Sequence, residues 1–260
     1  MRRISSTTID GSRGDRWGTT LAAGAYIART VGSGADLSCC LGLRRAAFRG
    51  GLGTDQDAFD PQSTHVLLTD RRDGQAVACF RYRVLEPADF AVCYTGRFYD
   101  LSPLATEKGP FVELGRVAVA PGRGDADVLR LLFAALTGMA VGARARLIFG
   151  CSSFPGADPR RHAAALAWLG AQPGQPVAIR ARAAADIPEA APDPAGVPQL
   201  LRSYLGLGAR VGAEAVVDRD LDTIHLFTRL ALADVPVARA RTLCRLLSAS
   251  VPDQNEKAPV

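Results

Sequence analysis

The sequence predicts an α/β fold, because strand-like and helix-like segments alternate through its middle. A strand-like run at 111–121 is separated by a turn from a helix-like segment at 127–141. Apolar residues recur in that segment at helical spacing, and Asp125 or Asp127 can cap its first turn. A second strand-like run follows at 146–153. We therefore expect a strand, a turn, a helix and a strand, in this order, at the centre of the fold.

Periodicity also places the flanking elements. Apolar residues at helical spacing predict a helix over 35–49. A glycine-bearing turn at 71–74 joins two strand-like runs, 65–70 and 76–85, into a hairpin. Further strand-like runs lie at 21–32, 91–99, 215–217 and 223–230.

Composition divides the chain into five segments. Residues 19–180 are expected to form the globular core, preceded by a loose basic arm at 1–18. The stretch 181–198 is rich in Pro, Ala and Asp, which predicts a linker or mobile loop. A C-terminal extension at 199–248 and a disordered tail at 249–260 complete the chain.

The net charge of +5 lies in the first 50 residues, which hold eight arginines and three aspartates. The other 23 basic and 23 acidic groups cancel. A basic patch attracts polyanions such as acyl carrier protein, anionic lipid headgroups or nucleic acid. A disordered basic arm without a partner is the alternative explanation.

The cysteines and the apolar stretches indicate the compartment. The six cysteines show no metal-ligand spacing and no secretory signal precedes them, so we expect reduced thiols, no metal site and a cytoplasmic protein. The longest apolar stretch, 131–143, is too short to span a bilayer. The protein is therefore expected to be soluble, or peripheral at the inner face of the cytoplasmic membrane.

A candidate catalytic carboxylate lies in Glu113-Leu-Gly-Arg116, on the first central strand. A partly buried carboxylate on a rigid strand can act as a general base and take a proton from a nucleophile directly or through one water. Strand side chains alternate, so Glu113 and Arg116 share a face only if a bulge intervenes, which Gly115 favours. The alternative is a Glu113–Arg116 ion pair with no catalytic role.

Glu113-Leu-Gly-Arg116 followed by Phe149-Gly-Cys-Ser-Ser-Phe-Pro-Gly156 resembles the ornithine N-acyltransferases of ornithine-lipid synthesis, which are relatives of the autoinducer synthases in the GNAT superfamily. The resemblance implies a GNAT-like acyltransferase fold, a mixed central sheet flanked by helices, whose C-terminal extension completes the acceptor and acyl site. It implies transfer of a 3-hydroxyacyl chain from acyl carrier protein to the α-amine of L-ornithine. The carrier's phosphopantetheine arm would hold the acyl donor, so no separate cofactor is expected. The implied substrates include no nucleic acid, so no nucleic-acid partner is expected.

The resemblance also assigns roles to residues. The autoinducer synthases have a functional glutamate in the strand that corresponds to Glu113, and Arg116 belongs to the same motif. In these relatives an acidic loop and a following arginine shape the acceptor site, which carries over to Asp57, Asp60 and Arg81.

Other candidates surround this group. His65 could be a proton shuttle or a satisfied core histidine. Gly150, Ser152 and Ser153 mark a strand end whose backbone N–H groups could face the thioester oxygen. Arg44 is expected to help bind the acidic carrier protein.

The loop at 121–126 retains Arg123, a candidate for donor binding. A helix start attracts anions, but Asp125 and Asp127 would repel a pyrophosphate placed there. This pattern disfavours coenzyme A and favours a carrier-bound arm. Cys151 is expected to be a buried structural thiol, because nothing near it in the sequence lowers its pKa.

Ornithine has an α-carboxylate and a distant δ-ammonium, so its site needs an arginine and a carboxylate. Asp218 and Asp220 are candidates for the ammonium end, and solvent-facing aspartates fit the pattern equally. The basic amphipathic segment 237–247 could lie on an anionic membrane or dock on its own domain. The rival functions are an acyl-homoserine-lactone or other N-acyl amino acid synthase and a non-catalytic acyl-binding module.

Overall fold

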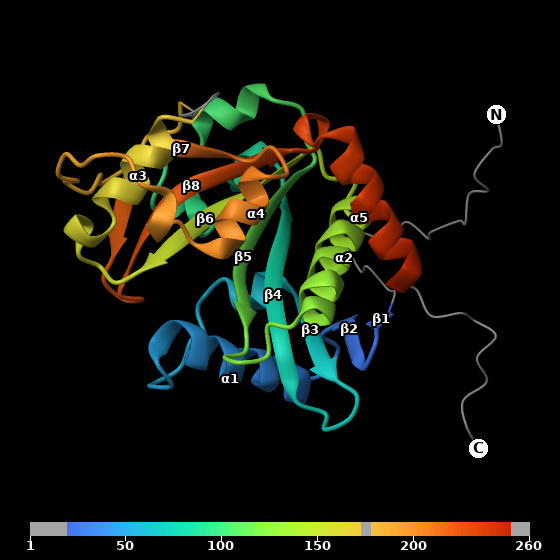
Figure 1. Ribbon diagram of the computed structural model, residues 1–260. Coiled ribbons are helices and arrows are strands. Elements are labelled where there is room, and N and C mark those ends of the chain that lie inside the picture. Colours follow the sequence, from blue (N-terminus) through green and yellow to red (C-terminus); the bar gives the residue numbers. More distant parts are fainter. Residues whose placement is uncertain (1–19, 173–177, 251–260) are drawn as a thin grey trace, which may run out of the picture.

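Within residues 20–172 and 178–250, which the computed structural model describes, eight strands form one mixed sheet (Figure 1). The strands are β1 (Leu21–Ala23), β2 (Tyr26–Thr30), β3 (Thr64–Asp70), β4 (Ala76–Leu85), β5 (Phe111–Val119), β6 (Leu147–Pro155), β7 (Arg210–Asp218) and β8 (Thr223–Ala231). Their order in the sheet is β1-β2-β3-β4-β5-β6-β8-β7. Neighbours are antiparallel except β5 and β6, which are parallel, so the expected mixed sheet is confirmed.

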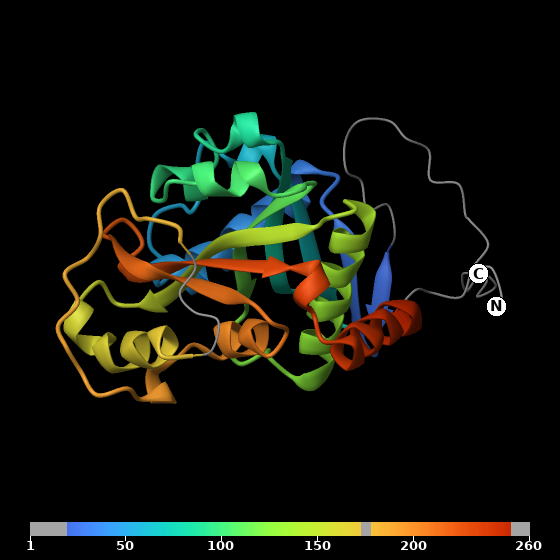
Figure 2. The same cartoon turned by 90° about the horizontal axis from the view of Figure 1, so that it is seen from above.

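Helices cover both faces of the sheet (Figure 2). On one face α1 (Gly34–Arg49) packs its Cys40 against Leu67. On the opposite face α2 (Ala126–Gly142) packs against Leu68, because successive strand residues point to opposite sides. We refer to these faces as the α1 face and the α2 face.

Three shorter or peripheral helices complete the α2 face. The helices α3 (Ala163–Gly170) and α4 (Gln199–Leu205) contact the half of the sheet formed by β6, β8 and β7. The last described helix, α5 (Val237–Ser250), lies along α2 and β1. Its Leu246 and Leu247 pack against the core, so α5 docks on its own domain in this structure.

The parallel strands β5 and β6 separate after a short paired stretch. Their register covers only Phe111↔Leu147, Val112↔Ile148 and Glu113↔Phe149, although each strand has nine residues. At the point of separation a Cβ on Gly150 would lie 2.2 Å from the Leu114 carbonyl oxygen. Glycine is therefore required where the two backbones pass each other.

A bulge in β5 lies directly beyond this point. The register with β4 shifts between Cys79 and Arg81, so β5 carries one extra residue there. Arg116 has a φ of 52°, in the left-handed region that is uncommon for residues other than glycine. The bulge turns the Arg116 side chain to the α1 face, where it bonds Asp55 and Asp57. The bulge that the sequence favoured at Gly115 is therefore present.

One expectation for secondary structure was wrong. Residues 91–99 form 3₁₀ turns instead of a strand, because the backbone N–H groups of Tyr94 and Thr95 donate to the Glu113 carboxylate. The C-terminal extension from residue 199 onward adds β7 and β8 to the central sheet, because β8 pairs with β6. Helix α3 was not predicted. The proposed arm at 1–18 and all but two residues of the proposed tail at 249–260 lie outside the described residues.

Candidate active site

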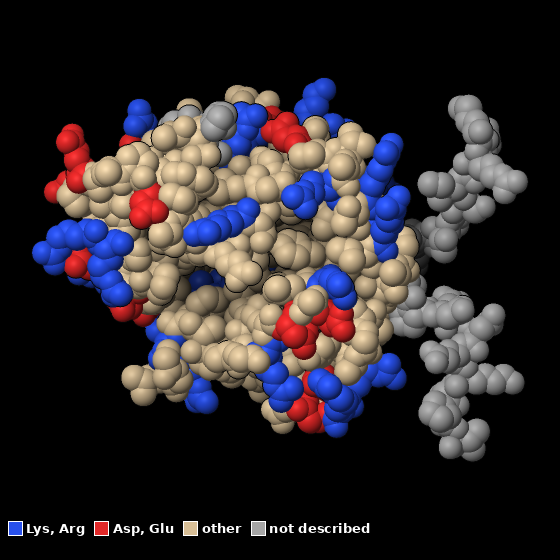
Figure 3. Space-filling view, viewed as in Figure 1, with Lys and Arg blue, Asp and Glu red and all other residues tan. Residues whose placement is uncertain are grey.

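A central cavity of about 370 Å³ occupies the space between the separated strands (Figure 3). On the α2 face its lining is largely apolar and comes from α2, α4 and α5, for example Leu136, Leu200 and Leu243. On the α1 face its lining is polar and includes Arg81 and Glu113. The cavity therefore consists of an apolar compartment on the α2 face and a polar compartment on the α1 face, which are connected through the gap between β5 and β6.

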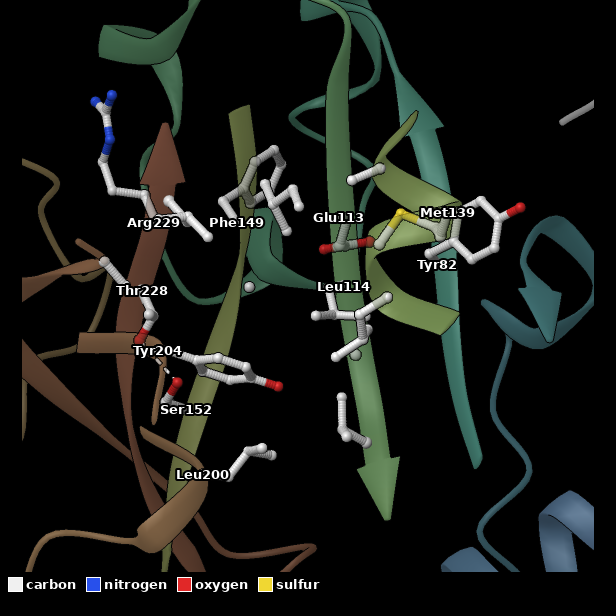
Figure 4. Close-up of a pocket in the computed structure, with 18 of the residues that line it drawn as sticks. Tyr82, Glu113, Leu114, Met139, Phe149, Ser152, Leu200, Tyr204, Thr228 and Arg229 are labelled. Atoms are coloured by element: carbon white, nitrogen blue, oxygen red, sulfur yellow. Dashed lines mark hydrogen bonds between the residues drawn. The ribbon is translucent and has the colours of Figure 1, made fainter. Parts of the chain in front are cut away.

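Glu113 stands where the two compartments meet (Figure 4). Its side chain is almost fully buried but reaches the cavity wall. The carboxylate accepts the backbone N–H of Thr95 at 2.6 Å and that of Tyr94 at 3.3 Å. These bonds hold the group in one orientation and leave lone pairs on both oxygens for a further donor. Arg116 contacts other partners, so the Glu113–Arg116 ion pair considered from sequence does not occur in the structure.

A buried ion-pair cluster, formed by Arg44, Asp55 and Asp60, packs behind the wall of the polar compartment. Arg44, only 1% exposed, donates to Asp55 at 2.7 Å and to Asp60 at 2.7 Å. Burial alone would raise the pKa of Asp60, but the hydrogen bonds from Arg44 and from the backbone of Asp57 lower it to about 2. Asp60 therefore stays ionised at neutral pH and fixes the position of the arginines around it.

Two further arginines connect this cluster to the cavity. Arg81 contacts Asp57 at 2.5 Å and Asp60 at 2.5 Å. Arg116 donates to Asp55 at 3.0 Å and to Asp57 at 3.2 Å, and its guanidinium lies 4.9 Å from the centre of the Tyr94 ring. Both arginines line the cavity. The aspartates thus hold two cations at the wall where an acceptor with a carboxylate would bind.

Tyr204 is a cavity residue that the sequence did not single out. Figure 4 shows its ring crossing β6, with the hydroxyl over the gap between β6 and β5. The hydroxyl oxygen is buried and has no hydrogen-bond partner among the described residues. Burial raises the pKa of Tyr204, so the phenol keeps its proton at neutral pH. Ser152, nearby on β6, instead accepts a bond from Thr228 at 2.8 Å.

The Cys151 thiol is poorly suited to be a nucleophile. Burial raises its pKa, and the nearby negative charge of Glu113 raises it further. A protonated thiol is a weak nucleophile. The structure therefore agrees with the expectation of a structural thiol, although Cys151 does line the cavity.

The cavity brings together only some of the candidates from the sequence. Its lining includes Arg81, Glu113, Arg116, Gly150, Ser152 and Ser153. Asp57 and Asp60 lie behind the two arginines. His65 is buried, with Nε2 at 3.2 Å from the Asp60 carbonyl oxygen, and burial lowers its pKa. These features fit the core histidine considered above rather than a proton shuttle.

Arg44, Arg123, Asp218 and Asp220 have other partners. The expectation that Arg44 binds a carrier protein was wrong, because the side chain is buried in the ion-pair cluster. Arg123 contacts Asp70 at 3.2 Å and lies outside the cavity lining. Asp220 pairs with Arg49 at 2.7 Å, and Asp218 accepts a bond from the Tyr94 hydroxyl at 3.3 Å.

Tyr94 and Asp55 were also missed as contributors to the site. Asp55 lies in the same acidic loop as Asp57 and Asp60. Only the fold shows that it contacts Arg44, Arg49 and Arg116. No group of three or more metal-ligating side chains with suitable geometry occurs within the described residues.

The separated parallel strands, the helix between them and the buried carboxylate define an acyltransferase of the GNAT type. In agreement, residues 43–134 match the family model described as Acetyltransferase (GNAT) domain. The chain belongs to the family of L-ornithine N(alpha)-acyltransferases. It is 30% identical over 184 residues to the member from Rhodobacter capsulatus, covering 65% of this chain and 71% of that protein.

A second relative agrees with this assignment, and a solved structure shares the fold. The L-ornithine N(alpha)-acyltransferase of Rhizobium meliloti is 32% identical over 202 residues, which cover 70% of this chain and 68% of that protein. The structure of FeeM, an N-acyl amino acid synthase from uncultured soil microbes, covers 83% of this chain and 97% of its own. Its TM-score of 0.50 at 12% identity shows a shared fold.

The ion-pair cluster makes a prediction about stability. Replacing Arg44 with Met should lower the free energy of unfolding by about 3 kcal/mol, the low end for a broken buried ion pair, because Asp55 and Asp60 lose their most buried cation and keep only Arg116, Arg49 and Arg81. Arg45 is the next residue of α1 and is exposed, so Arg45→Met should change that free energy by less than about 0.5 kcal/mol. Urea unfolding of both variants measures the difference, and equal losses would contradict the structural role of Arg44.

Proposed function

We propose that the protein transfers a 3-hydroxyacyl chain from acyl carrier protein to the α-amine of L-ornithine, which gives lyso-ornithine lipid. The observation that carries this proposal is the position of Glu113 between an apolar and a polar compartment. The names of the relatives support ornithine as the acceptor. The acyl chain would occupy the apolar compartment, and the amino acid the polar one.

In this scheme the neutral amine attacks the thioester carbonyl carbon, and Glu113 takes the amine's extra proton directly or through one water. The C–S bond then breaks, and the departing sulfur receives a proton from Tyr204, whose phenolate regains a proton through solvent as Glu113 releases the one it took from the amine. The Tyr204 phenol is protonated at neutral pH and its hydroxyl points into the gap. Backbone N–H groups on the separated edges of β5 and β6 would stabilise the oxyanion.

The acceptor would bind on the α1 face. The cations of Arg81 and Arg116 are suited to the α-carboxylate of ornithine, since both guanidinium groups are held in place at the cavity wall. Asp218 and Asp220 remain candidates for the δ-ammonium. Asp220 is the more accessible of the two, with a side chain 74% exposed.

The base is tested by Glu113→Gln, which preserves the side chain's shape. At neutral pH kcat should fall roughly 100-fold or more, the usual contribution of a general base. Activity should recover partly above pH ~8, where the α-amine loses its proton unaided. The matched control is Glu214→Gln, since Glu214 accepts a backbone N–H and pairs with Arg180, and neither residue lines the cavity.

Both variants should be assayed with a panel of amino acids and with homoserine-lactone precursors. Near-normal turnover of Glu113→Gln at pH 7 would remove Glu113 as the base. Acylation of another amine in preference to ornithine would replace the proposed acceptor. Tight binding of acyl carrier protein without any amide product would indicate an acyl-binding module.

A carrier-bound donor is supported by the start of α2. The N–H groups that would hold a pyrophosphate in an acetyl-coenzyme A enzyme are filled by the chain's own carboxylate. Asp125 accepts Asp127 N–H at 3.0 Å, Val128 N–H at 2.9 Å and the Tyr26 hydroxyl at 2.5 Å. A pyrophosphate at this position would find these N–H groups already bonded to Asp125, and the negative charge of Asp125 would repel it.

Replacing Asp125 with Ser should keep the helix cap and remove the charge. We expect kcat/KM with acyl-coenzyme A to rise roughly fivefold, the effect of relieving about 1 kcal/mol of repulsion, with little change for acyl carrier protein. Asp158→Ser is the control, because Asp158 also caps a helical turn through its side chain but lies away from α2 and from the cavity lining. Equal use of both donors by the unmodified protein would contradict a carrier-bound donor.

Peripheral contact with an anionic membrane is a separate part of the proposal. No helix within residues 20–172 and 178–250 is long and apolar enough to cross a bilayer. Arg241 and Arg245 lie on the exposed side of α5 and form no ion pair with any described carboxylate. An outward cationic face of this kind is suited to anionic lipid headgroups.

Exchanging both Arg241 and Arg245 for Ser should weaken binding to anionic liposomes roughly thirtyfold, at about 1 kcal/mol for each arginine. The control exchanges Arg160 and Arg161, which lie beside α3. Sedimentation with liposomes of anionic and of neutral composition measures the effect. If both pairs of exchanges weaken liposome binding equally, or if neither does, α5 is not the membrane-binding element.

A further inference from the structure

We propose that the first half of α5 is the end wall of the acyl site and sets the longest chain that the enzyme accepts. This inference rests on the proposed transfer of an acyl chain. The sequence of α5 suggested only that the helix contacts a membrane or docks on its own domain. The inference gives the inward face of α5 a further role, which is to bound the acyl site.

The inward face of α5 divides into two parts. In its second half, Leu246 and Leu247 pack against the hydrophobic core and hold the helix on the domain. In its first half, Ala240, Leu243 and Cys244 line the central cavity instead. The helix is therefore anchored at one end and borders the cavity at the other.

The direction of the cavity places α5 at the far end of a bound chain. The strands β5 and β6 are joined at Phe111↔Leu147 and open towards Ser153, so the carrier's arm has access from the open end. Beyond the reaction centre, the lining continues through Ile148 and Leu230, which are paired across β6 and β8. It then reaches Val235, two residues before α5 begins.

The joined ends of β5 and β6 stop a chain from continuing within the sheet plane. The chain must therefore run over the α2 face, between the strands and the second half of α2. Met139 and Ala140 of α2 line this part of the cavity together with Ala240 and Leu243 of α5. The terminal methyl group of a long chain would meet these α5 side chains.

The length limit is tested by enlarging a small wall residue. Ala240→Phe should shorten the preferred chain, and the longest donor accepted by the unmodified protein should lose roughly tenfold in kcat/KM, as for two methylene groups left unburied. The matched control is Ala238→Phe, the same exchange at an exposed position of the same helix. A series of 3-hydroxyacyl carrier proteins of increasing chain length gives the profile of each variant.

A second variant tests the opposite direction. Leu243→Ala removes wall volume and should move the preference towards longer chains, with kcat for short chains nearly unchanged. Opposite shifts for Ala240→Phe and Leu243→Ala cannot result from a general loss of folding.

Cys244 provides a measurement that does not depend on turnover. Its thiol is exposed at the cavity edge, and Cys39 on α1 is the other exposed cysteine among the described residues. In a Cys39→Ser background, a long 3-hydroxy fatty acid should slow the reaction of Cys244 with N-ethylmaleimide several-fold, whereas a short one should not. Mass spectrometry follows the labelling.

The outcomes separate this inference from the proposed function. If Ala240→Phe shifts the chain preference no more than Ala238→Phe, or if the long acid leaves the labelling of Cys244 unchanged, α5 does not bound the acyl site. If no donor of any length acylates ornithine, the proposed function fails, and the labelling experiment still decides whether α5 contacts the chain.

Discussion

The separation of β5 from β6 is the constraint on which the site depends. Interior strands of a sheet normally satisfy their backbone groups along both edges, but here pairing stops after Glu113↔Phe149. The unpaired edges create a passage through the sheet that carries apolar side chains on one side and charged ones on the other. Gly150 permits the last close approach of the backbones, and the β5 bulge then redirects Arg116. Two backbone irregularities thus assemble the reaction centre.

The charged side of this passage needs support that an apolar core cannot give. Arg44 sits beneath it, bonded to Asp55 and Asp60, and these carboxylates in turn hold Arg116 and Arg81. Burying isolated charges is strongly unfavourable, and mutual pairing offsets much of that penalty. Cations fixed in this way lose little conformational entropy when they bind an anion. The cluster is thus a scaffold for recognition as well as a part of the core.

The sequence predicted the elements whose determinants are local. Periodicity predicted the α1 and α2 helices and the β3–β4 hairpin, capping rules left Asp125 and Asp127 as candidates for the α2 cap, and Glu113 was located by its motif. The partners of Arg44 and the position of Tyr204 depend on contacts between distant segments, which spacing cannot reveal. Residues 91–99 were misjudged because their backbone N–H groups bond a side chain, Glu113, instead of a neighbouring strand.

The place of α5 in chain order has a consequence for how the apolar compartment forms and opens. As the last described element, α5 can be added to a finished sheet and can leave it without breaking any strand pairing. Detaching it exposes Leu246, Leu247, the wall residues beside them and the face of α2 along which the helix lies. Local openings that disrupt few buried contacts require the least free energy and occur most often. The apolar compartment therefore cannot close before α5 has been synthesised, and in the folded protein detachment of α5 opens the compartment while the sheet stays intact.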